Sequence, residues 1–438
     1  MSGHVFSRGK DLPLAVSGKG AEIFDADGRR YLDGSGGAIV VGVGHGVSEV
    51  ADAIADQART LAYAHGEAFS APTLEAYADD LAPLLPLGDP RVYPVSGGSE
   101  AIETALKMAR AYHLARGEDR HVVIGRVGSY HGNTRGALDV GGRRKLRDPY
   151  APWLGSSPHT TTPYEYRCPF PDTHPIGCGE RHASALDDLI RSEGADRVAA
   201  FVAEPVAGAA LAACVPPDDY WPAIERVCRE HGVLLIADEV MTGFGRTGEW
   251  FACNHWNLRP DIMTLAKGAS SGYWPLGLAV ASGSVYQTLS DGGFTHGFTY
   301  SHHAVGAAAG HAVLKYLRDH DLVTASAERG RQLDQALRDR LGDHQAVGDI
   351  RGLGLLRGIE LVADRSSKAK FAREERITEQ VIAAGRRRGV LIYSSTGGLD
   401  GPDGDLLLLG PPLVINEAQT DELAELTALA VRDVLGES

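Results

Sequence analysis

The sequence predicts an α/β fold, in which a large domain with a mainly parallel sheet is accompanied by a smaller α+β domain. Two observations predict it. Short apolar stretches alternate with helix-like ones over most of the chain, as they do where strands are joined by crossover helices. After about residue 325, long charged helices mix with short strands such as Leu406–Gly410. The alternating elements are predicted strands at 121–125, 198–205 and 233–238, and predicted helices after 96–100, at 183–193 and at 220–232.

The first residues are predicted to form a hairpin and then a helix. An Asp-Gly turn at Asp27–Gly28 separates two apolar pairs, Ile23–Phe24 and Tyr31–Leu32, which is typical of a β-hairpin. From about Val47 the spacing of apolar residues becomes helical. We divide the chain into an N-terminal segment that contributes to the small domain (1–60), a large domain (61–325) and a C-terminal small domain (326–438).

Composition and charge limit the kind of protein this is. At 438 residues the chain can bury a large core, or two cores that share an interface. Its net charge of −14 argues against general nucleic-acid binding, which needs clustered lysine and arginine. The first residues lack the apolar core of a signal peptide, and no stretch is long enough to span a membrane. Five cysteines do not make a disulfide framework in so long a chain, so we expect a reduced, cytoplasmic protein.

Four potential zinc ligands lie close together in the sequence: Cys168, His174, Cys178 and His182. Thiolate and imidazole are the ligands of structural zinc. Their gaps do not match the paired spacing of the usual zinc motifs, and the segment is rich in proline. A zinc site is therefore the alternative here, and we predict a loop with incidental cysteines and no metal.

Polar residues follow three of the predicted strands at their carboxyl ends. The apolar strand 233–238 ends in Asp238, and a buried carboxylate is costly unless a cation or a hydrogen-bond donor meets it. Glu204 and the segment Ser129–Gly132 follow two other strands in the same way. Ligands of open parallel sheets bind where loops leave these ends. We therefore expect the three loops to converge on one crevice.

Two further stretches supply an anion site and an amine. Gly98 and Ser99 lie in a turn before an apolar-striped helix, where backbone N–H groups and the helix dipole favour a phosphate. Lys267 ends an apolar run that reads as a buried strand. Burial lowers the pKa of a lysine and makes it a usable amine nucleophile. The alternative is a lysine that reaches from the strand end to solvent.

Together these features match the needs of pyridoxal 5'-phosphate. That cofactor needs an anchor for its phosphate, a stacking partner for its ring, an amine for a Schiff base and an acid that faces the ring nitrogen. The phosphate anchor is supplied by Gly98 and Ser99, and the stacking partner by Tyr130. The amine is Lys267 and the acid is Asp238. We interpret Asp238 as the partner of a protonated pyridine nitrogen, whose charge makes the ring an electron sink.

The chain also resembles the class III, fold type I aminotransferases, the group that contains ω-amino-acid:pyruvate, 4-aminobutyrate and acetylornithine aminotransferases. The likeness covers nearly the whole chain. Its most specific motifs are DEVMTGFGRTGEWFA, AKGASSGYWPLG, SGGSEAIETALKMAR, SYHG, AEPV, HGFTYS and VGDIRGLGLLRGIEL. The resemblance implies a seven-stranded, mainly parallel sheet, pyridoxal 5'-phosphate as the cofactor, and a homodimer with shared active sites.

The resemblance also implies a role for each matching residue. Lys267 matches the Schiff-base lysine, which moves the proton between the substrate carbon and the cofactor, and Asp238 matches the acid on the pyridine nitrogen. These two are the predicted catalytic residues. Val240 and Tyr130 match the residues on the two faces of the ring. The other predicted cofactor-binding residues are Gly98 and Ser99 in the phosphate cup, His131 beside Tyr130, Glu204 near Asp238, and Thr299, which reaches the phosphate of the partner subunit's cofactor.

Departures from the family pattern bear on the loops and on the substrate. The family's TYSGHP reads TYSHHA, so His302 and Ala304 replace a glycine and a proline, and we expect a local change of the loop. Glu417 stands where several ω-amine transaminases carry an arginine that binds the substrate carboxylate. A cationic or neutral amino donor is therefore favoured. Arg351 and Arg357 are the other candidates for a carboxylate, unless they are structural.

We predict an enzyme that moves an amino group from an amine or ω-amino acid to a 2-oxo acid, with pyruvate favoured over 2-oxoglutarate. The predicted mechanism is ping-pong, through an aldimine of Lys267. A racemase, aminomutase or decarboxylase would use the same lysine and aspartate and is the alternative. A serine hydrolase centred on Ser270 is the weaker alternative, because Pro275 and its flanking glycines break the helix that a GxSxG elbow needs.

Overall fold

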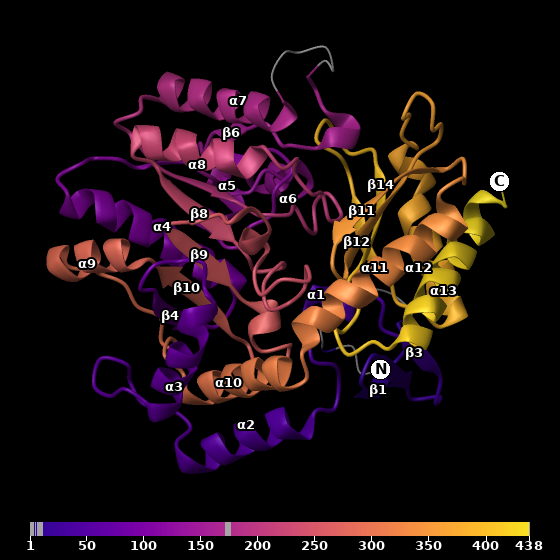
Figure 1. The fold of residues 1–438 in the computed structure, drawn as a ribbon, viewed down its shortest axis with the longest axis horizontal. Helices are drawn as coiled ribbons and strands as arrows, with labels where there is room; N and C mark the ends of the chain where they lie inside the picture. The colour runs from indigo at the N-terminus through magenta and orange to yellow at the C-terminus, as the bar shows by residue number, and fades with distance from the viewer. Residues whose placement is uncertain (1–3, 5, 7–11, 171–176, 438) are drawn as a thin grey trace.

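The largest element of the fold is a seven-stranded sheet, seen in a computed structural model that describes residues 4, 6, 12–170 and 177–437 (Figure 1). The strand order is β4-β10-β9-β8-β7-β5-β6. The strand β10 runs antiparallel to both of its neighbours, and the four pairs from β9 to β6 are parallel. The predicted seven-stranded, mainly parallel sheet is therefore confirmed. Its strands are β4 (Arg91–Val95), β5 (Val122–Arg126), β6 (His159–Thr160), β7 (Val198–Ala203), β8 (Leu234–Asp238), β9 (Ile262–Leu265) and β10 (Gly277–Ala281).

Helices cover both faces of this sheet: α4 (Gly98–Ala115) and α9 (Gly283–Gly292) on one, α7 (Cys178–Glu193) and α8 (Tyr220–His231) on the other. Side chains alternate across a strand, so Leu234 and Ile236 of β8 join the core under α4, while Leu235 and Ala237 join the core under α8. A strand buried on both faces reads as a continuous apolar run. The helix predicted at 183–193 begins five residues earlier than expected, at Cys178.

A second, four-stranded antiparallel sheet lies in the C-terminal part of the chain, in the order β11-β12-β14-β13. Helices α11 and α12 pack on this sheet, and α13 packs against both of these helices (Figure 1). The short strand predicted at Leu406–Gly410 is β14. The bounds are β11 (Val347–Leu353), β12 (Leu356–Leu361), β13 (Tyr393–Thr396), β14 (Asp405–Leu409), α11 (Leu322–Leu341), α12 (Ile377–Arg388) and α13 (Glu417–Leu435).

The N-terminal residues form a third sheet, of three strands: β1 (Ala15–Lys19), β2 (Glu22–Asp25) and β3 (Arg30–Leu32). The predicted hairpin is the pair β2–β3, in which Ile23 lies opposite Tyr31. This sheet contacts the C-terminal part, since Leu32 bridges to Val390 and Arg30 forms an ion pair with Glu422 at 2.7 Å. Three further helices pack together beside the large sheet: α2 (Ser48–Thr60), α3 (Pro72–Leu81) and α10 (Ala304–Asp319).

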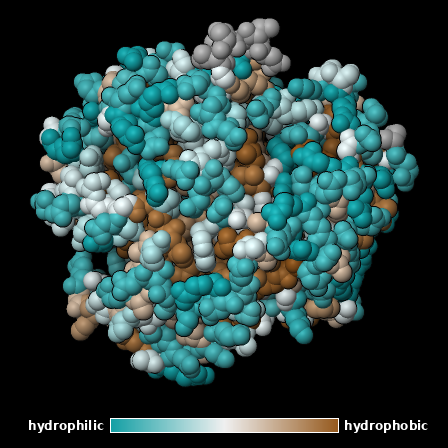
Figure 2. Space-filling view, viewed as in Figure 1, coloured by the Kyte–Doolittle hydropathy of each residue, from teal (hydrophilic) through white to brown (hydrophobic). Residues whose placement is uncertain are grey.

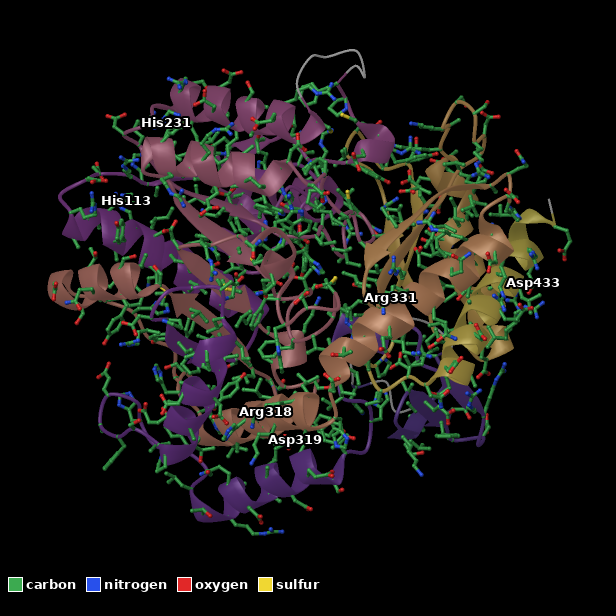
Figure 3. All side chains as sticks on the ribbon, viewed as in Figure 1. His113, His231, Arg318, Asp319, Arg331 and Asp433 are labelled. Carbon is green, nitrogen blue, oxygen red and sulfur yellow. The ribbon has the colours of Figure 1, made fainter. Side chains whose placement is uncertain are left out.

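The surface is mostly hydrophilic, with hydrophobic residues gathered near the middle of the face in Figure 2. Charged side chains such as Arg318 of α10 and Arg331 of α11 are exposed on the outer helices (Figure 3). Among the described residues, no helix is both long and apolar enough to cross a membrane. The remaining short helices are α1 (Gly36–Ile39), α5 (Arg135–Val140) and α6 (Arg144–Arg147), with 3₁₀ turns at Ala82–Leu84, Asp148–Trp153, Glu165–Arg167, Ala252–Trp256, Lys267–Ala269 and Arg373–Glu375.

Candidate active site

The loops that leave the carboxyl ends of β5, β7 and β8 converge on one cavity of about 400 Å³. The crevice expected at this edge of the sheet is therefore present. Eight of the nine predicted site residues line it, and Thr299 does not. Those that line it are Gly98, Ser99, Tyr130, His131, Glu204, Asp238, Val240 and Lys267.

Asp238 is the last residue of β8 and is only 3% exposed. Its Oδ1 accepts hydrogen bonds from the Val240 backbone N–H at 3.0 Å and from the Thr264 hydroxyl at 3.1 Å. Its Oδ2 lies 2.7 Å from Nδ1 of His131, which is buried as well. These donors offset the cost of burying a carboxylate. They also fix the direction in which the carboxylate faces the cavity.

Lys267 follows β9 and occupies a strained backbone conformation, with φ at 42°. Positive φ is costly for a residue with a side chain, and such strain gathers at functional sites. Burial lowers the pKa of Lys267 to about 8, although the negative charges of Asp238 and Glu204 act in the opposite direction. The amine is therefore neutral in about a tenth of molecules at pH 7 and in about half near pH 8, and the neutral form is the one that a nucleophile or a base requires.

The loop that carries Lys267 is held by the N-terminal part of the chain. The Ser271 hydroxyl accepts hydrogen bonds from the backbone N–H groups of Gly42 and Val43, at 2.8 and 3.0 Å. The Tyr273 hydroxyl accepts from Val47 N–H at 2.7 Å and donates to the carbonyl of Gly44 at 3.0 Å. A segment more than 200 residues away in sequence thus fixes the position of the lysine loop.

The N-terminus of α4 opens into the cavity and has no side-chain cap. A side chain at Gly98 would meet Val240 Cγ1 at 3.0 Å, so glycine permits this close approach. The Ser99 hydroxyl accepts the backbone N–H of Asn133 at 3.0 Å. Uncapped N–H groups at the positive end of an 18-residue helix suit an anion.

Glu204 follows β7 and lies between the cavity and the adjacent loops. Its Oε1 accepts Gly208 N–H at 3.2 Å, and its Oε2 accepts Tyr130 N–H at 3.4 Å. Burial raises the pKa of Glu204, against the lowering effect of His131 and Arg126. Glu204 thus connects the loop after β7 with the loop after β5, on which Tyr130 and His131 stand.

Three residues that the sequence singles out lie outside this cavity: one as a contact with the partner subunit, and two as departures from the family pattern. Thr299 is exposed, and its carbonyl accepts a hydrogen bond from the Tyr63 hydroxyl at 2.7 Å. Glu417 begins α13 with an 81% exposed side chain, 3.7 Å from Arg329. His302 has φ at 58°, a conformation that favours the glycine found there in the family pattern.

Arg351 and Arg357 are occupied by structural contacts. Arg351 donates to the carbonyls of Leu211 and Ala212, at 2.6 and 3.0 Å, and pairs with Asp349 and Glu360 at 2.9 and 3.1 Å. Arg357 donates to three backbone carbonyls in addition to the Asp334 carboxylate, which is 3.0 Å away. Neither arginine lines the cavity. These contacts favour a structural role for the two arginines over the binding of a substrate carboxylate.

The serine-hydrolase alternative finds no support in the geometry. Ser270 does line the cavity, but its hydroxyl donates to the carbonyl of Trp274 at 2.5 Å. The chain after it turns at Ser271 and Gly272, both at positive φ, and the next helix begins only at Gly283. The strand-to-helix elbow that exposes a nucleophilic serine is absent.

Sequence reasoning missed the apolar walls of the cavity and the role of Glu239. The walls are formed by apolar side chains that the sequence does not distinguish from core residues: Val40, Val206, Ala209, Met241, Trp274 and Leu276. Glu239 is fully buried, where it accepts the Thr242 hydroxyl and the backbone N–H of Cys253, and it does not line the cavity. The second acid of the Asp238–Glu239 pair therefore braces the loop after β8.

Comparison with known proteins identifies the family. The model of the aminotransferase class-III family matches residues 6–431. The uncharacterized aminotransferase YodT of Bacillus subtilis is 37% identical, over 96% of this chain and 95% of its own. The putrescine–pyruvate aminotransferase of Pseudomonas aeruginosa is 35% identical (95% and 90% covered), as is the taurine–pyruvate aminotransferase of Rhodobacter capsulatus (96% and 92% covered).

Solved structures agree with this assignment. An (S)-enantioselective ω-transaminase from Thermomicrobium roseum superposes with a TM-score of 0.91 at 38% identity, covering 99% of this chain and 96% of its own. The ω-transaminase of Pseudomonas jessenii, solved in complex with PMP, has a TM-score of 0.91 at 30% identity (98% and 94% covered). Enzymes of this family depend on pyridoxal phosphate. The chain therefore belongs to the class III aminotransferase family and is an aminotransferase of fold type I.

Proposed function

We propose that this chain binds pyridoxal 5'-phosphate and moves an amino group from a primary amine or ω-amino acid to a small 2-oxo acid such as pyruvate. One observation carries the proposal: Lys267, Asp238 and the uncapped N-terminus of α4 all open into one cavity. An amine, a fixed carboxylate and an anion cradle are what this cofactor needs. The family assignment supports the same reaction class.

The residues present fit the cofactor. Lys267 would hold it covalently, and Asp238 would pair with its ring nitrogen. The bare backbone at Gly98 and Ser99 would hold the phosphate, because no side chain fills the start of α4. Tyr130 would stack on the ring. A further sign of fit is Nε2 of His131, which is buried without a hydrogen-bond partner among the described residues and belongs to the group that holds Asp238.

The roles of the chain's own groups follow from this geometry. When bound, the cofactor supplies an electron sink for negative charge at the substrate carbon. The Lys267 amine, with a pKa of about 8, is suited to take a proton from that carbon and to return it to a neighbouring one. The charge of Asp238 would hold the ring nitrogen in its protonated form, and His131 and Thr264 keep the carboxylate in place.

The cavity walls indicate the class of amino donor. The charged residues that line the cavity are Lys267, Asp238 and Glu204, and no arginine of the described chain joins them. A carboxylate at the far end of the donor would therefore meet the apolar wall formed by Val40 and Trp274, among others. Monoamines therefore suit this cavity better than ω-amino acids do. The relatives named as putrescine–pyruvate and taurine–pyruvate aminotransferases support pyruvate as the acceptor.

We also propose a cytoplasmic homodimer with shared active sites. Thr299 is exposed, and the exposed rings of Tyr63 and Tyr300 beside it lie 6.3 Å apart. Exposed aromatic residues of this kind suit an interface, across which Thr299 would reach the partner's cofactor phosphate. Light scattering is expected to give twice the chain mass of 46.5 kDa. A stable, fully active monomer would contradict the shared site.

A donor panel tests the proposed reaction. Monoamines, diamines and ω-amino acids are each incubated with the purified protein, pyridoxal phosphate and pyruvate, and alanine is followed. Alanine is expected to form one-to-one with the amine consumed, and fastest from amines without a distal carboxylate. Carbon dioxide release or inversion of the donor without alanine formation would instead indicate a decarboxylase or a racemase, and would overturn the proposal.

A further inference from the structure

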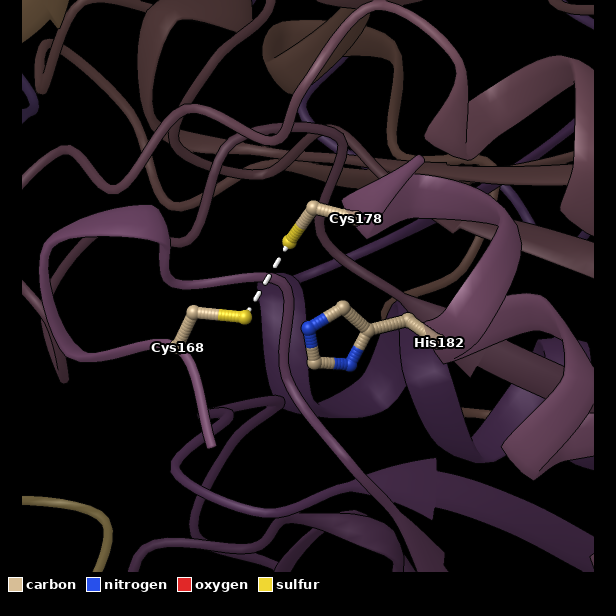
Figure 4. A group of neighbouring side chains, drawn as sticks. All are labelled: Cys168, Cys178 and His182. Carbon is tan, nitrogen blue, oxygen red and sulfur yellow. Dashed lines mark hydrogen bonds between the residues drawn. The ribbon is translucent and has the colours of Figure 1, made fainter. Parts of the chain in front are cut away.

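A second group of chemically reactive side chains lies outside the catalytic cavity. Cys168 follows the 3₁₀ turn Glu165–Arg167, Cys178 begins α7, and His182 lies one helical turn further along α7 (Figure 4). The two Sγ atoms are 3.3 Å apart, and one potential ligand atom from each of the three residues lies within 4.8 Å of the others. The cysteines are half-buried and the histidine is fully buried. The predicted candidate His174 lies outside the described residues.

The histidine is oriented as metal-binding histidines are. Its Nδ1 is 2.7 Å from the Thr161 hydroxyl, which fixes the ring. Its Nε2 is buried, has no hydrogen-bond partner within the described part of the chain, and faces the two thiols in Figure 4. A polar partner on one ring nitrogen and a free second nitrogen is the usual arrangement around a metal. An orphaned buried nitrogen is costly, so a ligand at this point would remove a penalty.

From this juxtaposition we infer a zinc site with three protein ligands, Cys168, Cys178 and His182. Binding converts the two thiols to thiolates, and their two protons leave to solvent. Two thiolates balance the charge of Zn²⁺, the neutral imidazole is the third ligand, and a water molecule fills the fourth position.

The distances favour a metal over a disulfide. Tetrahedral Zn–S bonds of about 2.3 Å place two sulfurs about 3.8 Å apart, so the Sγ atoms of Cys168 and Cys178 need to separate by only about half an ångström from 3.3 Å. A disulfide, at about 2.05 Å, requires them to close by more than an ångström. It would also leave the buried Nε2 of His182 without a partner.

The consequence of this site is structural. The segment that ends at Cys168 packs on the four-stranded sheet, since Arg167 pairs with Glu360 at 2.5 Å and Arg351 lies 4.7 Å from the Tyr164 ring centroid. Zinc would therefore tie α7, on the large sheet, to a segment that contacts the smaller one. We expect it to stabilise the fold without taking part in amino transfer.

The test is elemental analysis of the zinc content of the purified holoenzyme. The protein is produced in cells grown with added zinc and is dialysed before the measurement. About one zinc per chain is expected, and it should fall below about a tenth in Cys178→Ser. Thr161→Val leaves all three ligands in place and should weaken zinc binding about 10- to 100-fold. Cys228→Ser changes a buried cysteine of α8 and is the matched control, which should keep its zinc. Cobalt substitution should give the strong visible bands of tetrahedral thiolate coordination.

Two results would overturn the inference. One is wild-type protein that retains less than about a tenth of an equivalent of zinc and binds no added cobalt with these bands. The other is a Cys168–Cys178 disulfide, seen as a loss of two free thiols and a fall of two mass units in the protein as isolated. Because amino transfer should be unchanged in Thr161→Val, failure here is distinguishable from failure of the proposed activity.

Discussion

The cavity at the end of the large sheet and the arginines beside the small sheet both bury charge, but they do so differently. Arg351 has two carbonyls and two carboxylates within hydrogen-bond distance. Lys267 instead faces a cavity, burial lowers its pKa, and the nearby Nε2 of His131 has no partner in the described chain. A buried charged side chain whose partners all belong to the protein stabilises the fold. A charged side chain that lines a cavity is available to bind a ligand.

The largest loss of activity is expected when the Lys267 amine is removed. Lys267→Ala should abolish the near-visible absorbance of the bound cofactor and lower turnover by at least about 10⁴-fold, because it removes the group that we propose to hold the cofactor and move the proton. Both are measured on folded protein, checked by circular dichroism. A folded mutant that keeps either the absorbance or the turnover would show that Lys267 is not the cavity's reactive amine.

Asp238 and Glu239 are adjacent acids, and the comparison predicts opposite outcomes for them. Asp238→Asn keeps the shape of the side chain but loses the charge that we propose to pair with the ring nitrogen, so turnover should fall about 10²–10³-fold. Glu239→Gln is the matched control, since Glu239 does not line the cavity. It should cost stability, with turnover per folded molecule nearly unchanged. Equal losses of turnover in the two variants would show that Asp238 and Glu239 do not differ in role.

Arg351→Gln tests the other side of the comparison. It leaves the buried Glu360 with one cationic partner fewer, although Arg167 remains. The expected cost is about 3 kcal/mol in the free energy of unfolding. The KM for donors that carry a carboxylate should stay the same. Arg331→Gln, exposed on α11, is the control and should be neutral in both measurements. A selective rise in KM for carboxylate donors would make Arg351 a substrate residue.

The smallest expected effect is the change with pH in the rate at which the apoprotein binds pyridoxal phosphate. The Lys267 pKa is lowered from 10.5 to about 8, so the neutral amine rises from about 10% at pH 7 to about 90% at pH 9. The rate at which the apoprotein captures pyridoxal phosphate should therefore increase about tenfold over this range, with a midpoint near pH 8. Stopped-flow absorbance measures it. A midpoint near 10.5 would indicate an ordinary, solvated lysine.

The sequence predicts that charged residues at the ends of apolar strands share one crevice, because a charge at such a position is costly to bury without a partner. Asp238 and Lys267 each follow such a strand, β8 and β9, and the structure places them on one cavity. The seven-stranded sheet and the N-terminal hairpin are confirmed for a similar reason, since apolar period and turn residues are local signals. The roles of the individual site residues, and the division of the chain at 60 and 325, stay predictions.

Other features depend on contacts that the sequence does not display. The wall residues Val40 and Trp274 are apolar, like the core, and only the fold turns them toward the cavity. The sequence places Cys178 and His182 among four potential zinc ligands, but a helix predicted to begin at 183 leaves both of them in a loop. Since α7 begins at Cys178, these residues lie four positions apart on one helical face.

The four hydrogen bonds that join residues 42–47 to Ser271 and Tyr273 matter for anyone who re-engineers the beginning of the chain. A shortened or fused start that disturbed this anchorage would loosen the strained peptide at Lys267, while the distant cores stayed intact. Cofactor retention would then decline before heat resistance did, so a screen that records melting alone would pass enzymes already losing their prosthetic group.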